Sequence, residues 1–346
     1  MGLRCDASPA TGVGHLARCL ALADELGTRA VTVTLLGRID GAPWLVRAVA
    51  DRGLDVVPAP DDPVELASLC ADLGLDGLVL DGYTLDPGSG RAARDAGLTV
   101  LALRDGPFGA AQSADIHLEQ NLGATPVETL TTGELSLAGV EFALLRDDVL
   151  RHRRDLAAPS EPYSPPSPPK VLAFFGGTDA AGAAPTVASL VLATALPLEL
   201  TVVAATPEIA DELTALELPA HQRLVVIAPT PEIAALAAGA DLVVTASGSS
   251  VGELLAIGSP TAVLTVADNQ LVGYTTLVEH GVVAPLGSLD ALRHDADAAT
   301  TQLRELLSSP EARLGLARRG RALVDGRGRE RVADALLAAI EARPAP

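Results

Sequence analysis

Four short loops combine glycine and small polar residues with side chains that can move a proton or bind an anion. The first runs Gly12-Val13-Gly14-His15 and enters the helical pattern of residues 16–26. Gly12 and Gly14 permit positive φ and the close approach of a ligand, and a helix start attracts anions. His15 adds a side chain that titrates near neutral pH. Because the positive helix end favours neutral imidazole, we expect His15 to act as a general base.

The other three loops also follow expected strands. One of them consists of paired glycines and a polar residue. The next is rich in hydroxyl groups and leads into a helix that carries Glu253, and the last is a cluster of an acid and two amides. Their residues are Gly176-Gly177-Thr178, Ser247-Gly248-Ser249-Ser250 and Asp268-Asn269-Gln270. The serine loop predicts an uncharged cradle for a diphosphate, with Glu253 placed to accept hydrogen bonds from ribose. The chain's two asparagines, Asn121 and Asn269, both stand in polar clusters after strands, which indicates a hydrogen-bonding role.

Short apolar runs alternate with helical patterns along the chain, which predicts α/β architecture with parallel sheets. We expect strands at 31–36, 54–57, 77–80, 99–103 and 116–118, and again at 171–175, 198–204, 224–227, 242–245 and 261–266. A proline-rich linker at 157–169 separates an N-terminal domain (1–156) from a C-terminal domain (170–346) with a helical tail. Ligands of such folds bind at the carboxyl ends of the strands, here in the cleft between the two halves.

Composition excludes several function classes. The net charge is −19 and aromatic residues make up 2% of the chain, which argues against nucleic acid or an anionic membrane as partner. Three cysteines and six histidines show no metal-ligand spacing, so we expect neither a metal nor a cofactor. With no apparent signal peptide or membrane span, we expect a cytoplasmic protein.

The same motifs carry a family resemblance. The segment RCDAS followed by TGVGHLARCLALADEL, and then LDGY, LEQNLGA, GVEFALLR, FFGGTD, SGSSVGELLAIGSP and DNQ, resembles the UDP-sugar hydrolases of the pseudaminic-acid pathway. That family is related to spore-coat-polysaccharide proteins and, more distantly, to the glycosyltransferase that makes lipid II. The resemblance implies a GT-B fold, in which two Rossmann-like domains face each other across a cleft and UDP binds the C-terminal one. It also implies metal-independent hydrolysis of a UDP-linked amino-deoxysugar.

Roles follow from the resemblance residue by residue. It implies that His15 is the base, that Tyr83 and Asn269 lie near the sugar, and that Asp6 and Arg4 support the first loop. In the C-terminal half it implies that Glu253 holds the ribose and that Ser249 and Ser250 hold the diphosphate. The remaining expected substrate contacts are Gly12, Gly14, Asn121, Gly176, Gly177, Thr178, Ser247, Gly248 and Gln270. Departures from the family pattern lie in the N-terminal half, at Gly82, Arg104-Asp105 and Phe142.

Three other functions remain open. A glycosyltransferase on the same fold would replace water with an acceptor hydroxyl. An NAD(P) oxidoreductase would use the loose fingerprint Gly12-x-Gly14-x-x-Ala17, but the expected acid after the second strand is missing. The last alternative is an inactive nucleotide-sugar-binding protein.

Overall fold

The computed structural model describes residues 1–7, 14–40, 43–105, 109–127, 130, 133–156 and 168–343. They form two compact units: Met1–Asp147 together with the C-terminal segment from Gly326, and Asp148–Asp325. Most of the expected linker, residues 157–167, lies outside the described residues, as does Gly12. Among the described residues, no helix has the length and apolarity needed to cross a membrane.

The first unit is built on a parallel sheet. Among the described residues it has seven strands in the order β3-β2-β1-β4-β5-β6-β7. Their bounds are β1 Gly2–Arg4, β2 Thr34–Leu36, β3 Asp55–Val57, β4 Gly77–Leu80, β5 Thr99–Leu103, β6 Ile116–Glu119 and β7 Leu135–Ala138. Every neighbouring pair is parallel. The central strands are apolar on both sides because helices cover both faces.

Two sets of helices supply that cover. On one face, α1 (Gly14–Thr28), α2 (Pro43–Ala50) and α14 (Gly328–Glu341) share a core with alternate strand residues. On the other face, α3 (Pro63–Asp72) and α4 (Ser89–Asp95) pack over the remaining ones. Asp62 fixes the start of α3, because its carboxylate accepts hydrogen bonds from the Val64 and Glu65 amides. A short helix η1 (Val140–Phe142) follows β7.

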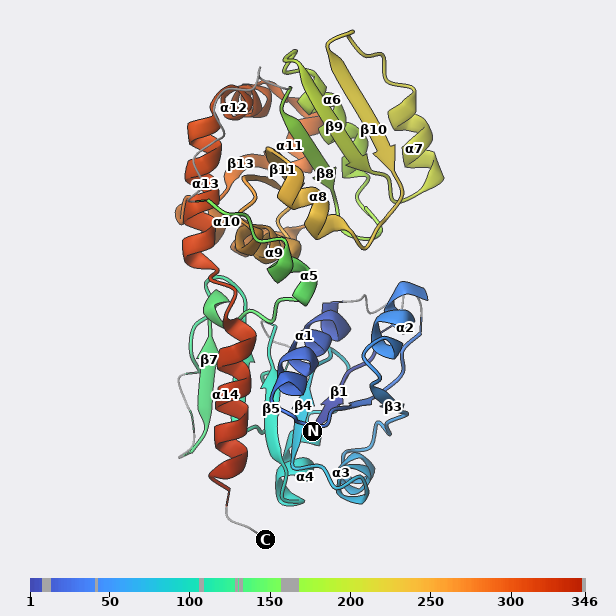
Figure 1. Cartoon of the computed structure of the whole chain (residues 1–346), viewed down its shortest axis with the longest axis vertical. Coiled ribbons are helices and arrows are strands. Elements are labelled where there is room, and N and C mark those ends of the chain that lie inside the picture. The colour runs from blue at the N-terminus through green and yellow to red at the C-terminus, as the bar shows by residue number, and fades with distance from the viewer. Residues whose placement is uncertain are drawn as a thin grey trace. The chain divides into compact units, whose positions relative to one another are not determined.

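The C-terminal helix differs from the sequence-based expectation, which placed it in the second domain. Val332, Ala333 and Leu336 of α14 are buried in the same core as α1, and Figure 1 shows α14 in red alongside the dark-blue α1. At its start, a Cβ on Gly328 would lie 2.3 Å from the Ala143 carbonyl oxygen, so the backbones approach closely. The apolar stripe of a helix predicts that it packs, but not on which sheet.

The second unit repeats the plan of the first. Its sheet has six strands, counted over the described residues, in the order β10-β9-β8-β11-β12-β13. All neighbouring pairs are again parallel. The bounds are β8 Lys170–Phe174, β9 Leu198–Val203, β10 Gln222–Ile227, β11 Leu242–Ala246, β12 Thr261–Thr265 and β13 Ala284–Ser288.

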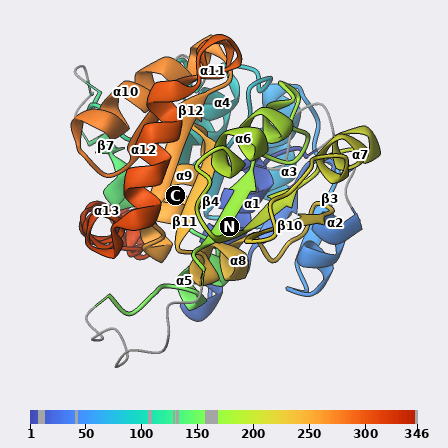
Figure 2. The same cartoon turned by 90° about the horizontal axis from the view of Figure 1, so that it is seen from above.

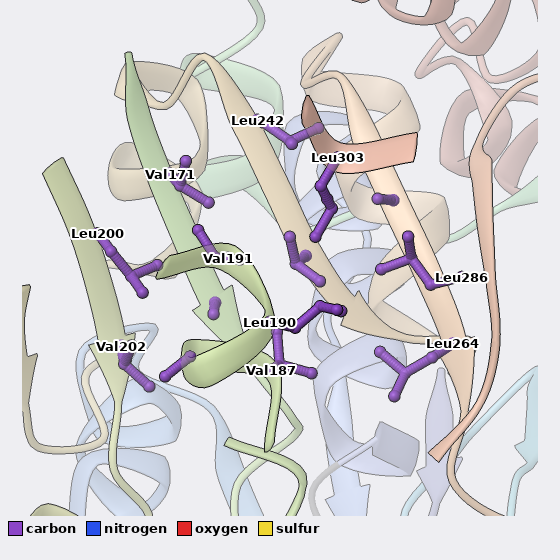
Figure 3. Packing of buried hydrophobic residues seen from close by; sticks show 14 of the residues in the cluster. Val171, Val187, Leu190, Val191, Leu200, Val202, Leu242, Leu264, Leu286 and Leu303 are labelled. Atoms are coloured by element: carbon purple, nitrogen blue, oxygen red, sulfur yellow. The ribbon is translucent and has the colours of Figure 1, made fainter. Parts of the chain in front are cut away.

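Helices again cover the second sheet. In Figure 2, α6 and α12 lie in front of its strands, and in Figure 3 Val187, Leu190 and Leu303 of these helices meet Leu200, Leu242 and Leu264 of the sheet. Right-handed crossovers place α8 and α9 on the opposite face, because the chain there moves along the sheet in the other direction. The helices are α5 Asp147–Arg151, α6 Ala183–Leu192, α7 Pro207–Thr214, α8 Ile233–Gly239, α9 Ser250–Ile257, η2 Asp268–Gln270, α10 Leu271–Glu279, α11 Leu289–His294, α12 Asp297–Ser308 and α13 Pro310–Leu323.

Both sheets reverse their strand order at the first strand of the unit. In the first unit the reversal lies between β1 and β4, and in the second between β8 and β11. A crevice opens at such a switch point beyond the carboxyl ends of the strands, and it is the usual ligand site of doubly wound sheets. The loops that follow these four strands contain many of the sequence-predicted site residues. The expected doubly wound α/β architecture is confirmed.

Candidate active site

His15 lies at the switch point of the first sheet, against a buried carboxylate. It is the second residue of α1 and is 5% exposed. Its Nδ1 lies 2.6 Å from Oδ1 of Asp81, the residue directly after β4. Asp81 is 1% exposed. Because an ionised carboxylate only accepts hydrogen bonds, Nδ1 donates in this contact, and a neutral His15 would carry its lone pair on Nε2. That tautomer is the one that a general base needs.

Arg18, one helical turn after His15, binds the same carboxylate with two nitrogens. Its Nε donates to Asp81 Oδ2 at 2.6 Å and its Nη2 to Oδ1 at 2.5 Å. Burial alone would raise the pKa of Asp81, but the hydrogen bonds from Arg18 and His15 outweigh it and hold that pKa below its usual range. Arg18 Nη2 also lies 2.9 Å from His15 Nδ1. We call His15, Asp81 and Arg18 the acid–base cluster.

A second polar group lies beside this cluster. The Tyr83 ring meets the His15 ring edge to face, with centroids 4.4 Å apart and an interplanar angle of 83°. Tyr83 Oη donates to Asp105 Oδ2 at 2.7 Å, and Asn121 Nδ2 donates to Asp105 Oδ1 at 3.0 Å. Burial and the bond to Asp105 raise the pKa of Tyr83 to about 12. Asp105 therefore joins Tyr83 and Asn121, which were both predicted as site residues. Asp105 itself was noted in the sequence only as a departure from the family pattern.

Arg4 and Asp6 are engaged within the loops around β1. The Arg4 guanidinium donates to Asp6 Oδ2 at 2.7 Å and to Asp61 Oδ1 at 3.3 Å. Asp6 Oδ1 accepts from the backbone amide of Arg38 at 2.8 Å. These bonds tie the end of β1 to the chain after β2. The carboxylate in contact with His15 is Asp81, so the geometry of Asp6 fits support of the loop. Gly14 is exposed at the start of α1.

The glycine loop after β8 is shaped by a capping carboxylate. Asp179 accepts hydrogen bonds from the amides of Ala183 at 2.8 Å and Ala184 at 3.0 Å, at the start of α6. Those amides are therefore satisfied by the protein itself. Gly176, Gly177 and Thr178 are exposed in front of the cap. The α6 end is consequently a weak anion site.

The serine loop after β11 has the opposite character. Ser249 precedes α9 and makes no side-chain capping bond to it. The Val251 amide donates to the Gly248 carbonyl at 3.1 Å, so the helix start is held by backbone and not by a side-chain acceptor. Ser247 is 7% exposed, and its hydroxyl has no hydrogen-bond partner in the described part of the chain. Gly248 is exposed. A buried hydroxyl without a partner is costly unless a ligand or water completes it. We call Ser247–Ser250 the hydroxyl loop; it is the better anion cradle of the two.

The remaining predicted residues of the second unit lie close to this loop in the sequence or in the fold. Gln270 accepts from the Val266 amide at 3.0 Å, and its Nε2 would be 4.0 Å from a Cβ on Gly248. Gln270 thus fixes the loop after β12 next to the hydroxyl loop. Asn269 is exposed in η2, and Glu253 is half-buried in the first turn of α9.

Sequence reasoning missed Asp81, Arg18 and Asp105 as site residues. The sequence places Asp81 directly after the apolar run GLVL, but only the structure shows that this strand neighbours β1 in the sheet. Arg18 follows His15 by three residues and so lies on the same helix face. In the described part of the chain, no three acidic, histidine or cysteine side chains converge as metal ligands.

Comparisons with known proteins extend these observations. No family model matches the chain. It is 36% identical over 106 residues to the spore coat polysaccharide biosynthesis protein SpsG of Bacillus subtilis (strain 168), which is 31% of this chain and 31% of that protein. The match thus spans about a third of the relative's length.

Solved structures match over nearly the whole chain. MurG of Acinetobacter baumannii superposes with a TM-score of 0.72 at 16% identity, covering 97% of this chain and 99% of that one. The UDP-GlcNAc 2-epimerase of Neisseria meningitidis bound to UDP-GlcNAc superposes with a TM-score of 0.64 at 13% identity, covering 97% and 99%. At these identities the likeness is one of fold. The expected GT-B fold class, with two Rossmann-like parallel-sheet domains, is confirmed.

Proposed function

We propose that this protein is a nucleotide-sugar enzyme that transfers a glycosyl group from a UDP-sugar to a hydroxyl acceptor, with His15 as general base. Its support is the buried contact between His15 and Asp81, which leaves Nε2 as the proton acceptor. The GT-B fold, which MurG shares, favours transfer over hydrolysis. The partial match to SpsG, whose name refers to polysaccharide biosynthesis, is consistent with sugar chemistry.

The chemical step follows from these roles. His15 Nε2 takes the proton of the acceptor hydroxyl while the oxygen of that hydroxyl bonds to the anomeric carbon. The bond from that carbon to the diphosphate oxygen breaks, and UDP leaves with the electron pair. Asp81 holds the imidazole through Nδ1. General-base assistance contributes roughly 10²–10⁴ in rate.

The second unit would bind the leaving group. The uncapped α9 end and the Ser247 hydroxyl offer neutral donors to the diphosphate, and Glu253 would accept from ribose hydroxyls. Asn269 and Gln270 would contact the donor nearby, with Gly176, Gly177 and Thr178 as further contacts. In the first unit, Tyr83 and Asn121 would contact the sugar or acceptor, and Gly14 would leave room for it.

Hydrolysis is the second candidate, with water as the acceptor in the same step. The motifs around His15 favour it, because they resemble UDP-sugar hydrolases. It predicts the same dependence on His15 and a different dependence on acceptor.

A panel of UDP-sugars, scored for UDP release with and without pooled hydroxyl acceptors, tests both. Release only with acceptor supports transfer, and release from donor alone supports hydrolysis. His15→Ala should lower the rate by roughly 10²–10⁴ with UDP binding retained. The matched control is His221→Ala, an exposed histidine of the second unit, which should keep the wild-type rate. A folded His15→Ala protein with wild-type turnover would contradict the assignment of His15 as the general base.

A further inference from the structure

We propose that Arg18 is a positioning residue that keeps His15 in its neutral, proton-accepting form by cancelling the charge of Asp81. The inference rests on the proposed function for its kinetic consequence, but its structural readout needs no substrate. It begins from the paired bonds between Arg18 and Asp81, at 2.6 and 2.5 Å. The Arg18 side chain is 13% exposed and that of Asp81 is 1% exposed, so water screens the pair poorly.

The net charge of the cluster decides which form of the imidazole is favoured. Asp81 carries −1, Arg18 carries +1 and neutral His15 carries none, so the buried cluster is neutral. A proton on His15 would leave it with a net +1 in a poorly hydrated place, which is unfavourable. Without Arg18 the balance reverses, because a neutral His15 would leave Asp81 as an uncompensated buried anion. Protonation of His15 would then restore neutrality.

Geometry assigns this role to Arg18 and to no other described neighbour of His15. Arg18 Nη2 lies 2.9 Å from His15 Nδ1 and occupies the same Asp81 oxygen as that nitrogen. Helix α1 sets this placement, because a three-residue offset brings both side chains to one face. The titratable or charged groups around His15 in the described residues are Asp81 after β4, Arg18 and Cys19 on α1, Tyr83 in the next loop, and Asp105 behind Tyr83. Arg18 is the cation among them.

Cys19 and Tyr83 do not substitute for Arg18. Two causes raise the pKa of the Cys19 thiol well above its usual range: the hydrogen bond with Cys5, which is the larger, and burial. The Cys19 thiol therefore stays neutral. Tyr83 also stays neutral, because burial and Asp105 raise its pKa to about 12. Asp105 adds negative charge, which increases the need for a cation at Arg18.

The test compares Arg18→Gln with wild type in two measurements. Nitrogen NMR of the substrate-free protein, with the His15 signal assigned from His15→Ala, reports the protonation of both ring nitrogens. We expect neutral imidazole with the proton on Nδ1 in wild type near pH 7, and imidazolium in Arg18→Gln. In the kinetic assay, the acidic limb of the pH profile should move up by about one pH unit or more, with the rate recovering in alkali.

Two further variants sharpen the comparison. Arg18→Lys keeps the positive charge and should keep the wild-type limb. The double variant Arg18→Gln/Asp81→Asn again has a neutral cluster, so its imidazole should be neutral as in wild type. Arg29→Gln is the matched control on the same helix: it loses ion pairs to Glu25 and Asp334 and should leave the pH profile unchanged.

Each of the following outcomes would contradict the role of Arg18 or the proposed function. A wild-type imidazole state in folded Arg18→Gln, with a rate lowered equally at all pH values, would reduce Arg18 to a structural residue. Where Arg18→Gln does not fold, imidazolium in the double variant would overturn the charge argument equally. A protein that releases no UDP from any donor would contradict the proposed function and leave the NMR result standing.

Discussion

Asp105 is the clearest example of chemistry that depends on one residue's contacts. Its two carboxylate oxygens accept from Tyr83 and Asn121, which come from different loops of the first unit. Both donors are neutral side chains, and Tyr83 also contacts the His15 ring of the acid–base cluster. A carboxylate held in this way can accept a further hydrogen bond from a hydroxyl or amide of a bound sugar.

Tyr83 supplies a prediction in alkaline solution. Its pKa is raised to about 12 in the folded protein, against about 10 for free tyrosine. Between about pH 10 and pH 12 the folded state therefore binds more protons at this site than the unfolded state does, so stability falls as pH rises through this window. We expect Tyr83→Phe to remove the late phenolate titration seen by ultraviolet absorbance and to flatten stability against pH there. An unchanged titration in Tyr83→Phe would contradict this.

Individual site residues were predictable to different degrees. His15 and Ser247 are visible in sequence because glycine and hydroxyl loops at helix starts form a local pattern. Asp81 is not, since its importance comes from β1 and β4 being neighbours in the sheet. Asp6 lies in the local motif after β1, and its bonds to Arg4 and to the Arg38 amide fit the expected support of the first loop. Contacts between residues 66 positions apart require the fold.

At the scale of elements, the N-terminal ends of helices α6 and α9 in the second unit differ in whether a side chain caps them. Helix α6 is capped by Asp179, whereas Ser249 makes no capping bond to α9, and the Ser247 hydroxyl in the loop before α9 has no partner among the described residues. The same strand–loop–helix pattern therefore yields one self-satisfied end and one that is open to a ligand.

Ser247→Ala tests this difference. Among the described residues the Ser247 hydroxyl has no hydrogen-bond partner, so its removal should leave the melting temperature nearly unchanged and weaken UDP binding roughly tenfold. The matched control is Ser259→Ala: Ser259 is buried and donates to the Ala237 carbonyl at 2.8 Å. It should lose about 1 kcal/mol of stability with UDP affinity intact. Calorimetric titration with UDP measures both, and equal affinities in the two variants would refute the assignment of the loop.

Helix α14 is held to α1 by an ion-pair network as well as by its apolar face. Glu25 of α1 accepts from Arg29 at 3.0 Å and lies 3.2 Å from Arg329 of α14. Arg329 also pairs with Asp147. Glu25 is 8% exposed, so the charges around it are poorly screened.

Glu25→Gln should destabilise the first unit by about 1–2 kcal/mol, because Arg29 and Arg329 lose their shared carboxylate while each keeps a second one, Asp334 and Asp147. Glu330→Gln is the control on α14: its partner Arg327 is exposed, and loss of that pair should cost about 0.5 kcal/mol or less. Urea unfolding followed by amide exchange in α1 and α14 gives both values. Similar losses in the two variants would show that the network contributes nothing special.

The elements themselves were largely predictable. Strands β4 and β5 have the expected bounds, because buried parallel strands are short continuous apolar runs. Strands β7 and β13 were missed: Leu135 on β7 is 42% exposed, and β13 contains Pro285 and Gly287. The partner of α14 was unpredictable, since periodicity describes one face and not what covers it.

At the scale of the whole molecule, the charge of −19 opposes the approach of an anionic ligand. We expect the association rate of UDP to rise as ionic strength goes from about 0.01 M to about 0.1 M, where the screening length falls from about 30 Å to about 10 Å. Stopped-flow binding measures this. Uridine, which is uncharged, is the control and should show no such dependence. A rate that falls with salt would mean that a local cationic field dominates.

The first unit is assembled from two separated stretches of chain, and this has a consequence for biosynthesis. Val332 and Leu336, which complete its core, leave the ribosome only after the whole second unit has been made. The second unit is continuous in sequence and can fold while translation proceeds. Until α14 arrives, the apolar face of α1 and its sheet is left partly uncovered, which is the kind of surface that chaperones protect. Folding order in the cell should therefore run opposite to the order of the units in the sequence.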